Sequence, residues 1–293
     1  MTLQTDWSRS PIGIAGAGRV GQVLARMLRE SRQPLACIAS RTRERAREAA
    51  AGAGIEAASY AELPRRVSRI LICVPDSALE TVAGQVRPVA GLVLHTCGTR
   101  GPEALEAIRN PRVACGTLHP LQTIADAAAG ADVLRGVAFA VAGDEPAVAW
   151  AEQIACLAGG RVLRIAAEAR PLYHAAAVMG SNYVVALVAA ARALMVAAGV
   201  EAVEALGALA PLARTSLENA LRDPVAALTG PIERGDLETI EAHLRALRAA
   251  PEPIDQLYRA AGLEALAVAR QRGLDAGCAG QVEASLRARL SGT

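Results

Sequence analysis

Short apolar runs alternate with stretches of helical periodicity through the first half of the chain. We interpret these runs as strands, over residues 12–15, 34–39, 69–74, 91–95, 113–115, 137–141 and 161–165. A loop is predicted over 116–122 and a helix over 145–157. Regular alternation of strands and helices predicts an α/β fold with a doubly wound, mainly parallel sheet.

The strand signals stop near residue 168, and helical patterns follow to the C-terminus. We predict helices over 168–199, 201–221, 224–229, 237–249 and 253–272. The predicted organisation is a leader over 1–10, a Rossmann domain over 11–166 and an all-helical C-terminal domain over 167–293.

The first predicted strand runs directly into glycines with the spacing G-x-G-x-x-G. In a dinucleotide fingerprint, the first glycine makes the tight turn and the second lets backbone N–H groups approach a pyrophosphate, while the third lets the helix pack on the strand. The phosphates then lie at the positive N-terminus of that helix. We therefore assign pyrophosphate binding to Gly16, Ala17, Gly18, Arg19, Val20 and Gly21, against the alternative of a plain strand–helix connection.

The end of the second predicted strand distinguishes between cofactors. An NAD site normally has Asp or Glu there, which accepts hydrogen bonds from the ribose hydroxyls. This chain has Ser40 and Arg41 instead, which suit the 2′-phosphate of NADP. We therefore predict NADP as the cofactor; the alternative, a solvated helix face, is favoured for Arg45 and Arg47.

Composition narrows the class of protein. The formal net charge of +2 is too small to indicate nucleic acid or an anionic membrane as a partner. The six cysteines stand far apart without nearby histidine ligands, so neither a zinc site nor a disulfide framework is predicted. The first residues contain no apolar signal core, and we expect a cytoplasmic enzyme.

The stretch 173–200 is almost wholly apolar and long enough to span a bilayer. His174, the pair Ser181-Asn182 and Arg192 interrupt it, and alanine dominates over leucine. We therefore expect a buried helix of a globular protein rather than a membrane span.

Polar residues follow several predicted strands at their carboxyl ends, where ligands bind in doubly wound folds. We assign Val74, Pro75, Asp76, Thr96, Cys97 and Gly98 to the rim of the cofactor site. His119 follows another strand and can titrate near neutrality, which suits proton transfer beside hydride transfer; a structural turn histidine is the alternative. His95 is interpreted as a core or loop-anchoring residue.

The predicted long helix carries a second candidate set. On one continuous helix, His174, Ser181 and Asn182 share a face, which indicates a catalytic and substrate-orienting cleft. The alternative is a core histidine beside residues that let helices approach. Further along, a turn rich in glycine and proline provides four candidate substrate-binding residues, Thr229, Gly230, Arg234 and Asp236. Arg234 is suited to bind a carboxylate, whereas Asp236 is more simply interpreted as a helix cap. His243 is expected on a solvated helix surface.

These strings together resemble a bacterial family of NADP-dependent oxidoreductases with a Rossmann-like N-terminal domain and a helical C-terminal domain of formerly unknown function. The resemblance is carried by residues 16–21, 74–76, 94–98, 118–123, 173–183 and 228–236. It implies a small-molecule substrate and a homodimer with the long apolar helix buried between subunits. Arg170 stands where relatives are expected to have lysine.

More distantly the chain is similar to ketopantoate reductases, pyrroline-carboxylate reductases, hydroxyisobutyrate dehydrogenases and prephenate dehydrogenases. The Lys-x-x-x-Asn pair of several of those enzymes is absent, since Val178 lies four residues after His174. We predict hydride transfer between NADP and a small carbonyl, hydroxyl or imine compound such as ketopantoate. A prephenate- or arogenate-type dehydrogenase and a redox-sensing regulator that binds NADP without turnover are the alternatives.

Overall fold

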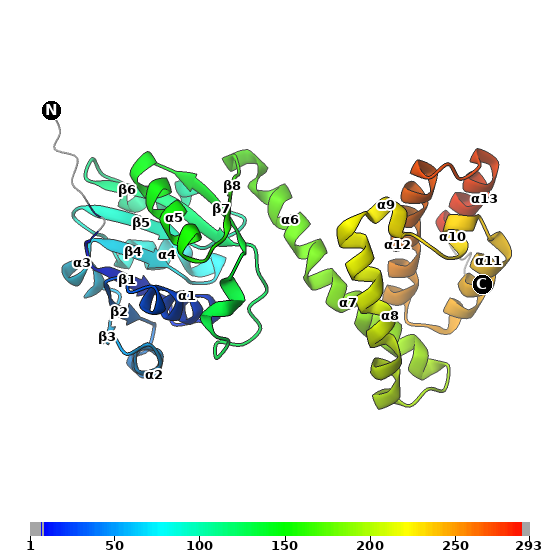
Figure 1. Cartoon of the computed structure of the whole chain (residues 1–293), viewed down its shortest axis with the longest axis horizontal. Coiled ribbons are helices and arrows are strands. Elements are labelled where there is room, and N and C mark those ends of the chain that lie inside the picture. The colour runs from blue at the N-terminus through cyan, green and yellow to red at the C-terminus, as the bar shows by residue number, and fades with distance from the viewer. Residues whose placement is uncertain (1–6, 8, 289–293) are drawn as a thin grey trace. The chain divides into compact units, whose positions relative to one another are not determined.

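The computed structural model describes Trp7 and residues 9–288, which form two compact units (Figure 1). The first unit ends at Gly180 and the second begins at Ser181. The leader predicted over 1–10 lies mostly outside the described residues. The first unit extends past the predicted boundary at 166 because helix α6 (Arg170–Gly180) is hydrogen-bonded to the sheet, as shown below.

The first unit contains an eight-stranded sheet in the order β3-β2-β1-β4-β5-β6-β7-β8, within the residues described. Every neighbouring pair is parallel except β6 and β7, which confirms the predicted doubly wound, mainly parallel sheet. The strands are β1 (Ile12–Ala15), β2 (Leu35–Ala39), β3 (Glu56–Ala58), β4 (Arg69–Ile72), β5 (Gly91–His95), β6 (Val113–Pro120), β7 (Ala138–Gly143) and β8 (Arg161–Arg164).

Helices cover both faces of this sheet. The α-helices of the first unit besides α6 are α1 (Arg19–Glu30), α2 (Arg43–Ala53), α3 (Leu63–Arg66), α4 (Leu79–Gln85) and α5 (Glu145–Leu157). Its 3₁₀ turns are η1 (Asp76–Ala78), η2 (Pro102–Ile108), η3 (Ala131–Leu134) and η4 (Ala167–Ala169). The helix predicted over 145–157 is therefore confirmed at both ends.

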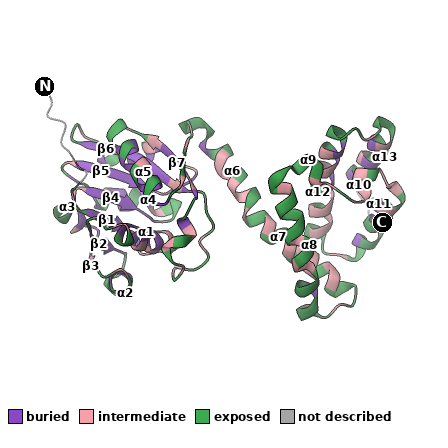
Figure 2. Ribbon diagram, viewed as in Figure 1, coloured by how far each residue is buried: buried purple, intermediate pink, exposed green. Residues whose placement is uncertain are grey.

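Successive side chains of each strand enter two separate cores, as the two-residue period of a strand requires. On β5, Leu92 and Leu94 pack in the core with α1 and α5, whereas Val93 packs in the core with α4 and η2. Figure 2 shows these strands as buried. Burial on both faces explains why the strands read as continuous apolar runs in the sequence.

Strand β6 corrects the predicted loop over 116–122. The strand continues through Pro120, and His119 pairs with Ala140 of the antiparallel strand β7. The composition Gly-Thr-Leu-His-Pro is typical of a turn, but ladder bonds to two neighbouring strands override that local preference. His119 is therefore held by a strand rather than by a loop.

The second unit is helical, as predicted. Its elements are α7 (Asn182–Ala197), α8 (Ala202–Arg222), α9 (Pro224–Ala227), α10 (Pro231–Arg234), α11 (Leu237–Ala246), η5 (Leu247–Ala249), α12 (Glu252–Gln271) and α13 (Ala276–Arg287). A small core centred on Ile240, Leu266 and Val282 holds α11, α12 and α13 together. Helix α13 and the single turn α10 were not predicted.

The predicted helix over 168–199 is two helices, α6 and α7. Ser181 separates them with φ −131° and ψ −75°, outside the helical region. The stretch Ala167–Ala197 remains long and apolar enough to cross a membrane, but none of its most apolar window is buried within the chain. The chain by itself therefore does not bury this stretch, and its predicted burial between subunits stays a prediction.

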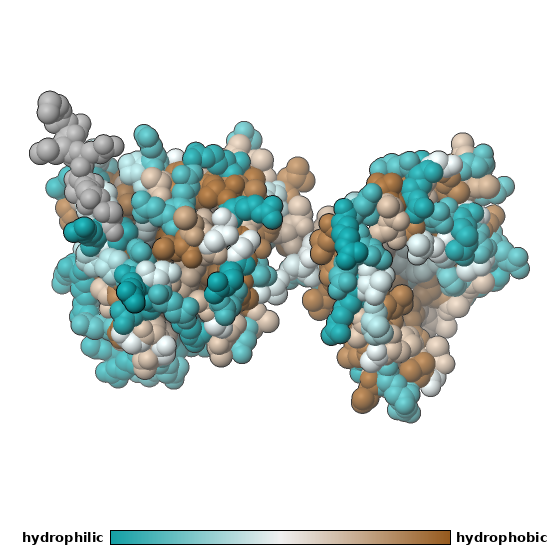
Figure 3. All heavy atoms as spheres, in the orientation of Figure 1, coloured by the Kyte–Doolittle hydropathy of each residue, from teal (hydrophilic) through white to brown (hydrophobic). Residues whose placement is uncertain are grey.

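Exposed apolar side chains continue onto α8, where Val203 is 88% and Leu221 78% exposed. Figure 3 shows apolar residues, in brown, on the surface of the helical unit. Exposed apolar side chains that gather on one surface are typical of an interaction site.

Candidate active site

The glycine turn after β1 has the geometry that dinucleotide binding requires. Gly16 has φ +125°, and a methyl group there would overlap the carbonyl oxygen of Cys73. A methyl group at Gly21 would likewise overlap the carbonyl oxygen of Gly16. Gly18 differs, because a substituent there would meet nothing within 4 Å. The turn is tightly packed at its two ends and open in the middle, so it fits a pyrophosphate lying against Gly18.

The N-terminus of α1 leaves backbone donors for such a group. The helix begins at Arg19, and its N-cap residue Gly18 provides no side-chain cap. The first N–H groups of a helix have no partner within it, and its dipole attracts anions. The side chain of Arg19 points elsewhere, since its Nη1 donates to the carbonyl oxygen of Ala125 at 3.1 Å. Arg19 is therefore positioned to bind a pyrophosphate with its backbone N–H group and not with its side chain.

The end of β2 carries the residues predicted for the 2′-phosphate. Ser40 is half-buried directly after the strand and Arg41 is exposed. Thr42 caps α2 by accepting from the backbone N–H of Arg45 at 3.4 Å. An exposed guanidinium and a hydroxyl in place of a carboxylate are compatible with a phosphate at this position.

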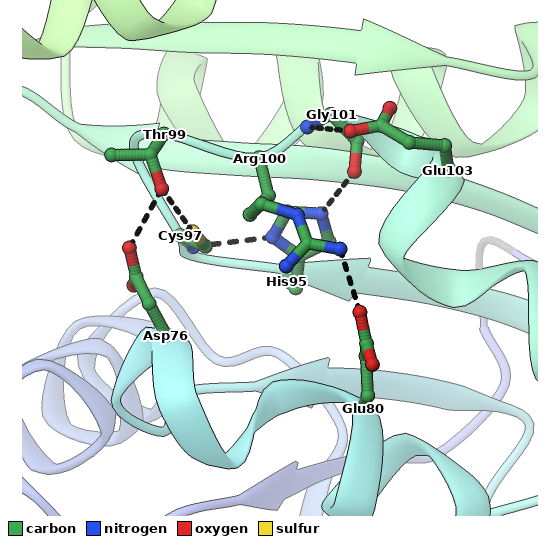
Figure 4. Close-up of polar contacts among 8 residues, drawn as sticks. All are labelled: Asp76, Glu80, His95, Cys97, Thr99, Arg100, Gly101 and Glu103. Carbon is green, nitrogen blue, oxygen red and sulfur yellow. Dashed lines mark hydrogen bonds and ion pairs between the residues drawn. The ribbon is translucent and has the colours of Figure 1, made fainter.

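The loops after β4 and β5 form the next part of the predicted rim. The hydroxyl of Thr99 donates to Asp76 Oδ2 at 2.8 Å and lies 3.4 Å from the sulfur of Cys97 (Figure 4). Burial acts to raise the pKa of Asp76, but hydrogen bonds from Cys97 and Thr99 prevail and lower it. Asp76 is therefore a carboxylate near neutral pH and ties the two loops together.

His95 anchors the loop after β5, as predicted. Its Nδ1 accepts from the backbone N–H of Cys97 at 3.2 Å, and its Nε2 donates to the carbonyl oxygen of Gly101 at 2.9 Å (Figure 4). Burial lowers the pKa of His95 to about 4. Because both ring nitrogens are occupied, His95 is a neutral structural residue.

His119 meets residues of α6 at the carboxyl end of the sheet. Its Nδ1 lies 2.8 Å from the hydroxyl of Tyr173, and its ring centroid lies 5.9 Å from that of His174. Burial, followed by the charges of His174 and Arg170, lowers the pKa of His119 to about 4. His119 is therefore a neutral imidazole near pH 7, with one ring nitrogen bound to a phenol.

Gly98 borders this pair from the loop after β5. A methyl group at Gly98 would lie 2.9 Å from Nε2 of His119 and would overlap Cδ2 of His174. The missing side chain is thus what permits the two imidazoles to approach this loop. The predicted residues His119, His174 and Gly98 are brought together by the structure.

Arg170 lies beneath the same group of residues. Its guanidinium is completely buried and donates to the hydroxyl of Thr117 at 3.0 Å and to the carbonyl oxygen of Cys97 at 3.3 Å. Its Nε has no hydrogen-bond partner. Burial lowers the pKa of this guanidinium. The residue ties α6 to strand β6 and to the loop after β5.

Sequence reasoning missed three members of this site, namely Thr117, Arg170 and Tyr173. Tyr173 directly precedes the predicted site residue His174, so the sequence indicated that it lies near the site. Its hydrogen-bond partner His119 is 54 positions away, and the sequence did not indicate that contact. For Arg170, the substitution of an expected lysine was the signal. Thr117 was concealed by the predicted loop over 116–122.

The remaining predicted residues belong to the helical unit, and their roles stay predictions. Because the helix breaks at Ser181, the projection that placed Ser181 and Asn182 on the face of His174 does not hold. Ser181 donates to the side-chain carbonyl of Asn182 at 3.2 Å. Both residues thus belong to the start of α7.

In the predicted substrate turn, Gly230 has φ +102° and precedes α10. Asp236 is a helix cap, accepting from the backbone N–H of Thr239 at 3.1 Å. Thr229 and Arg234 are exposed. This geometry provides a shaped turn with one exposed guanidinium.

The helical unit also contains an apolar cavity of about 520 Å³. Helices α7, α11 and α12 line it, and none of the predicted substrate residues does. His243 and Tyr258 belong to its wall, with Nδ1 of the histidine 2.8 Å from the phenol oxygen. His243 is exposed, as predicted.

Comparison with known proteins identifies both parts of the chain. Residues 11–94 match the family described as NADP oxidoreductase coenzyme F420-dependent, and residues 137–265 match a domain of unknown function, DUF2520. The second match begins with β7, so it includes the end of the sheet as well as most of the helical unit. No match to this chain was found among curated proteins.

Solved structures share the fold at low sequence identity. Protein TM1727 from Thermotoga maritima is 23% identical, with a TM-score of 0.70 over 89% of this chain and 99% of its own. BF3122 from Bacteroides fragilis, a proposed NADP oxidoreductase, is 24% identical, with a TM-score of 0.70 over 91% of this chain and 98% of its own. The 1-pyrroline-5-carboxylate reductase of Streptococcus pyogenes is 16% identical, with a TM-score of 0.60 over 94% and 96%. The chain therefore combines a segment that matches the NADP oxidoreductase family with a segment that matches DUF2520, on the fold shared by these structures.

Proposed function

We propose that this enzyme uses NADPH to reduce the double bond of a small carbonyl or imine compound, such as the 2-oxo acid ketopantoate. The observation that carries the proposal is the neutral His119 beside Tyr173, placed by β6 at the carboxyl end of the sheet. An acid–base group at that edge suits a reaction in which a proton accompanies hydride transfer. The pyrroline-carboxylate reductase of similar fold supports an imine as one substrate class.

Bound NADPH would supply the hydride, and the residues of this chain would bind it and manage the proton. The turn 16–21 would hold the pyrophosphate, and Ser40 and Arg41 the 2′-phosphate. The loops at Val74–Asp76 and Thr96–Gly98 would border the ribose and nicotinamide. His119 would transfer the proton to the substrate, and His174 would line the same space. Ser181 and Asn182 are proposed to orient the substrate.

The cofactor assignment is tested by Arg41→Ala, with Arg45→Ala on the exposed face of α2 as the matched control. Loss of a charge-assisted contact to the 2′-phosphate should weaken NADPH binding by about tenfold to a hundredfold and leave NADH binding unchanged. The measurement is a fluorescence titration of each cofactor. Equal affinity of the wild type for NADPH and NADH would contradict the assignment.

The reaction is tested in separate assays, by following NADPH oxidation with ketopantoate or 1-pyrroline-5-carboxylate and NADP reduction with prephenate. Turnover of ketopantoate or the pyrroline supports a reductase, whereas turnover of prephenate alone would favour a prephenate dehydrogenase. Tight NADPH binding without hydride transfer to any compound tested would instead favour a redox-sensing regulator.

We further propose a cytoplasmic homodimer in which a second copy covers the apolar surface of α7 and α8. The exposed residues Val203 and Leu221 support this assembly, since such surface is unfavourable in water. Val203→Glu should shift the chain to monomer in light scattering after size exclusion. Val89→Glu, at a 67% exposed apolar residue of the first unit, is the control and should leave the dimer intact. A monomeric wild type would contradict this proposal.

A further inference from the structure

A buried positive charge that forms no contact ion pair within the described part of the chain lies behind the candidate acid–base pair; the carboxylate charge that acts on it is that of Glu103. The two acceptors of Arg170, the hydroxyl of Thr117 and the carbonyl oxygen of Cys97, are both uncharged. Its Nε has no partner, and none of the ion pairs among the described residues includes it. A buried cation of this kind is costly for stability. A cation buried at this cost is suited to a site in which negative charge forms next to it.

Tyr173 is a group that can become an anion beside this charge. The two residues are three positions apart on α6, which makes them neighbours on one helix face. Burial raises the pKa of Tyr173, and the positive charge of Arg170 acts in the opposite direction. A phenolate at Tyr173 would thus supply the close negative charge that Arg170 lacks.

We propose that Tyr173, His119 and Arg170 form a proton relay, in which Tyr173 supplies the proton, neutral His119 carries it to the substrate and Arg170 stabilises the phenolate left behind. The inference rests on the proposed reductase function and names how that site provides its proton. His119 is the residue that touches the substrate; Tyr173 and Arg170 are positioning residues that act through it.

The step balances in protons and electrons. As the substrate carbon accepts hydride from NADPH, the π bond to oxygen or nitrogen breaks and that atom takes the proton from Nε2 of His119. In the same concerted event, Nδ1 of His119 takes the phenolic proton of Tyr173. The imidazole therefore remains neutral, now protonated at Nδ1, and Tyr173 is left as a phenolate beside Arg170. To reset the relay, Nε2 takes a proton from water while Nδ1 returns its proton to the phenolate. The oxidised product of the step is NADP.

The geometry allows this direction of transfer. Nδ1 of His119 is the nitrogen that meets the phenol, at 2.8 Å. Nε2 lies on the side of Gly98, which has no side chain to cover it. The charged or titratable groups around this imidazole are His174, Arg170, Tyr173, Asp76 and His95, and burial with the first two keeps its pKa low. A neutral imidazole with one nitrogen on a donor and the other beside a residue without a side chain is suited to carry a proton.

The test is long-range proton–nitrogen NMR of the full chain with NADP bound, because the chain contains only four histidines. Individual His→Gln variants assign the signals. The relay requires that His119 near pH 7 is protonated at Nε2 and unprotonated at Nδ1. Protonation at Nδ1 would overturn the proposal, since Tyr173 would then be an acceptor.

Arg170 is tested by comparing Arg170→Gln with Arg170→Lys. Removing the charge should raise the titration midpoint of His119 by about half a pH unit or more, whereas lysine should keep the wild-type midpoint. An unchanged midpoint in Arg170→Gln would remove Arg170 from the relay. If the glutamine variant does not fold, the nearly isosteric Tyr173→Phe decides the proposal: it should increase the share of the Nδ1-protonated tautomer of His119.

Tyr258→Phe is the matched control, because it removes a histidine–tyrosine hydrogen bond of the same length in the helical unit. It should leave the tautomer and midpoint of His119 unchanged. The proposed function is judged separately, by NADPH binding and turnover. A chain that binds and oxidises NADPH but has His119 protonated at Nδ1 would disprove the relay alone.

Discussion

The chain contains the same pair of side chains twice, once in each unit. In both pairs Nδ1 of a histidine lies 2.8 Å from a tyrosine hydroxyl, between His119 and Tyr173 and between His243 and Tyr258. The rings are also nearly perpendicular in both, at 89° and 88°. Local geometry therefore does not distinguish them.

The two pairs differ in their surroundings. His243 is exposed on α11, whereas His119 is half-buried, and its pair adjoins the buried guanidinium of Arg170. Burial raises the pKa of both tyrosines, but only for Tyr173 does an arginine oppose that increase. The difference teaches that the acid–base chemistry open to a hydrogen-bonded pair depends on the surrounding charges and on the exclusion of water.

The largest expected difference between the two pairs is in turnover. Tyr173→Phe should lower kcat for the identified substrate by about a hundredfold, since general acid catalysis contributes at least that much. Tyr258→Phe should leave kcat unchanged. The measurement is steady-state NADPH oxidation with NADPH binding checked in both variants. Equal kcat values in the two variants would contradict the proposed functional difference between the two histidine–tyrosine pairs.

A smaller loss is expected when the space beside His119 is filled. Gly98→Ala places a methyl group against both His119 and His174, and displacement of the rings should lower kcat by about tenfold. Gly207→Ala in the middle of α8 is the control, because its methyl group would meet nothing within 4 Å. That variant should keep full activity and unfold at a slightly higher temperature. Full activity of Gly98→Ala would show that the reaction does not depend on the observed positions of the His119 and His174 rings.

The smallest expected effect is that of His119→Gln on the free energy of unfolding at acidic pH. His119 in the folded chain takes up a proton only near pH 4, whereas an unfolded histidine does so near pH 6.5. Between these values the unfolded state binds more protons, so the free energy of unfolding falls as the pH is lowered. His119→Gln should remove up to about 1.4 kcal/mol per pH unit of that slope.

The remaining acid dependence in His119→Gln comes in part from His95, whose pKa is also lowered to about 4 by burial. The measurement is urea unfolding at several pH values from 4 to 7. His243→Gln is the matched comparison, since it leaves the buried histidine in place. An identical slope in wild type and His119→Gln would mean that His119 titrates alike in both states.

Much of the cofactor half was predictable because its signals are local. Gly16 and Gly21 are required by backbone overlap within one turn, and the strands are continuous apolar runs because both faces of the sheet are covered. The candidate acid–base site was predicted only in part. His119 was predicted as a member, but as a loop residue. Tyr173 and Arg170 were not predicted because their partners come from β6 and from the loop after β5.

By itself, the sequence determined the glycine turn, the alternation of strands and helices, the helix cap at Asp236 and the polar residue types at the ends of strands. Each of these depends on backbone sterics, periodicity or hydrogen bonds between residues close in the chain. The tertiary structure alone decided that His119 meets Tyr173 rather than a partner on its own strand, that the helix breaks at Ser181 and that Arg170 is buried without a contact ion pair to any described residue. The physical reason is that pairing, burial and electrostatic environment depend on long-range contacts, which no local pattern of residues specifies.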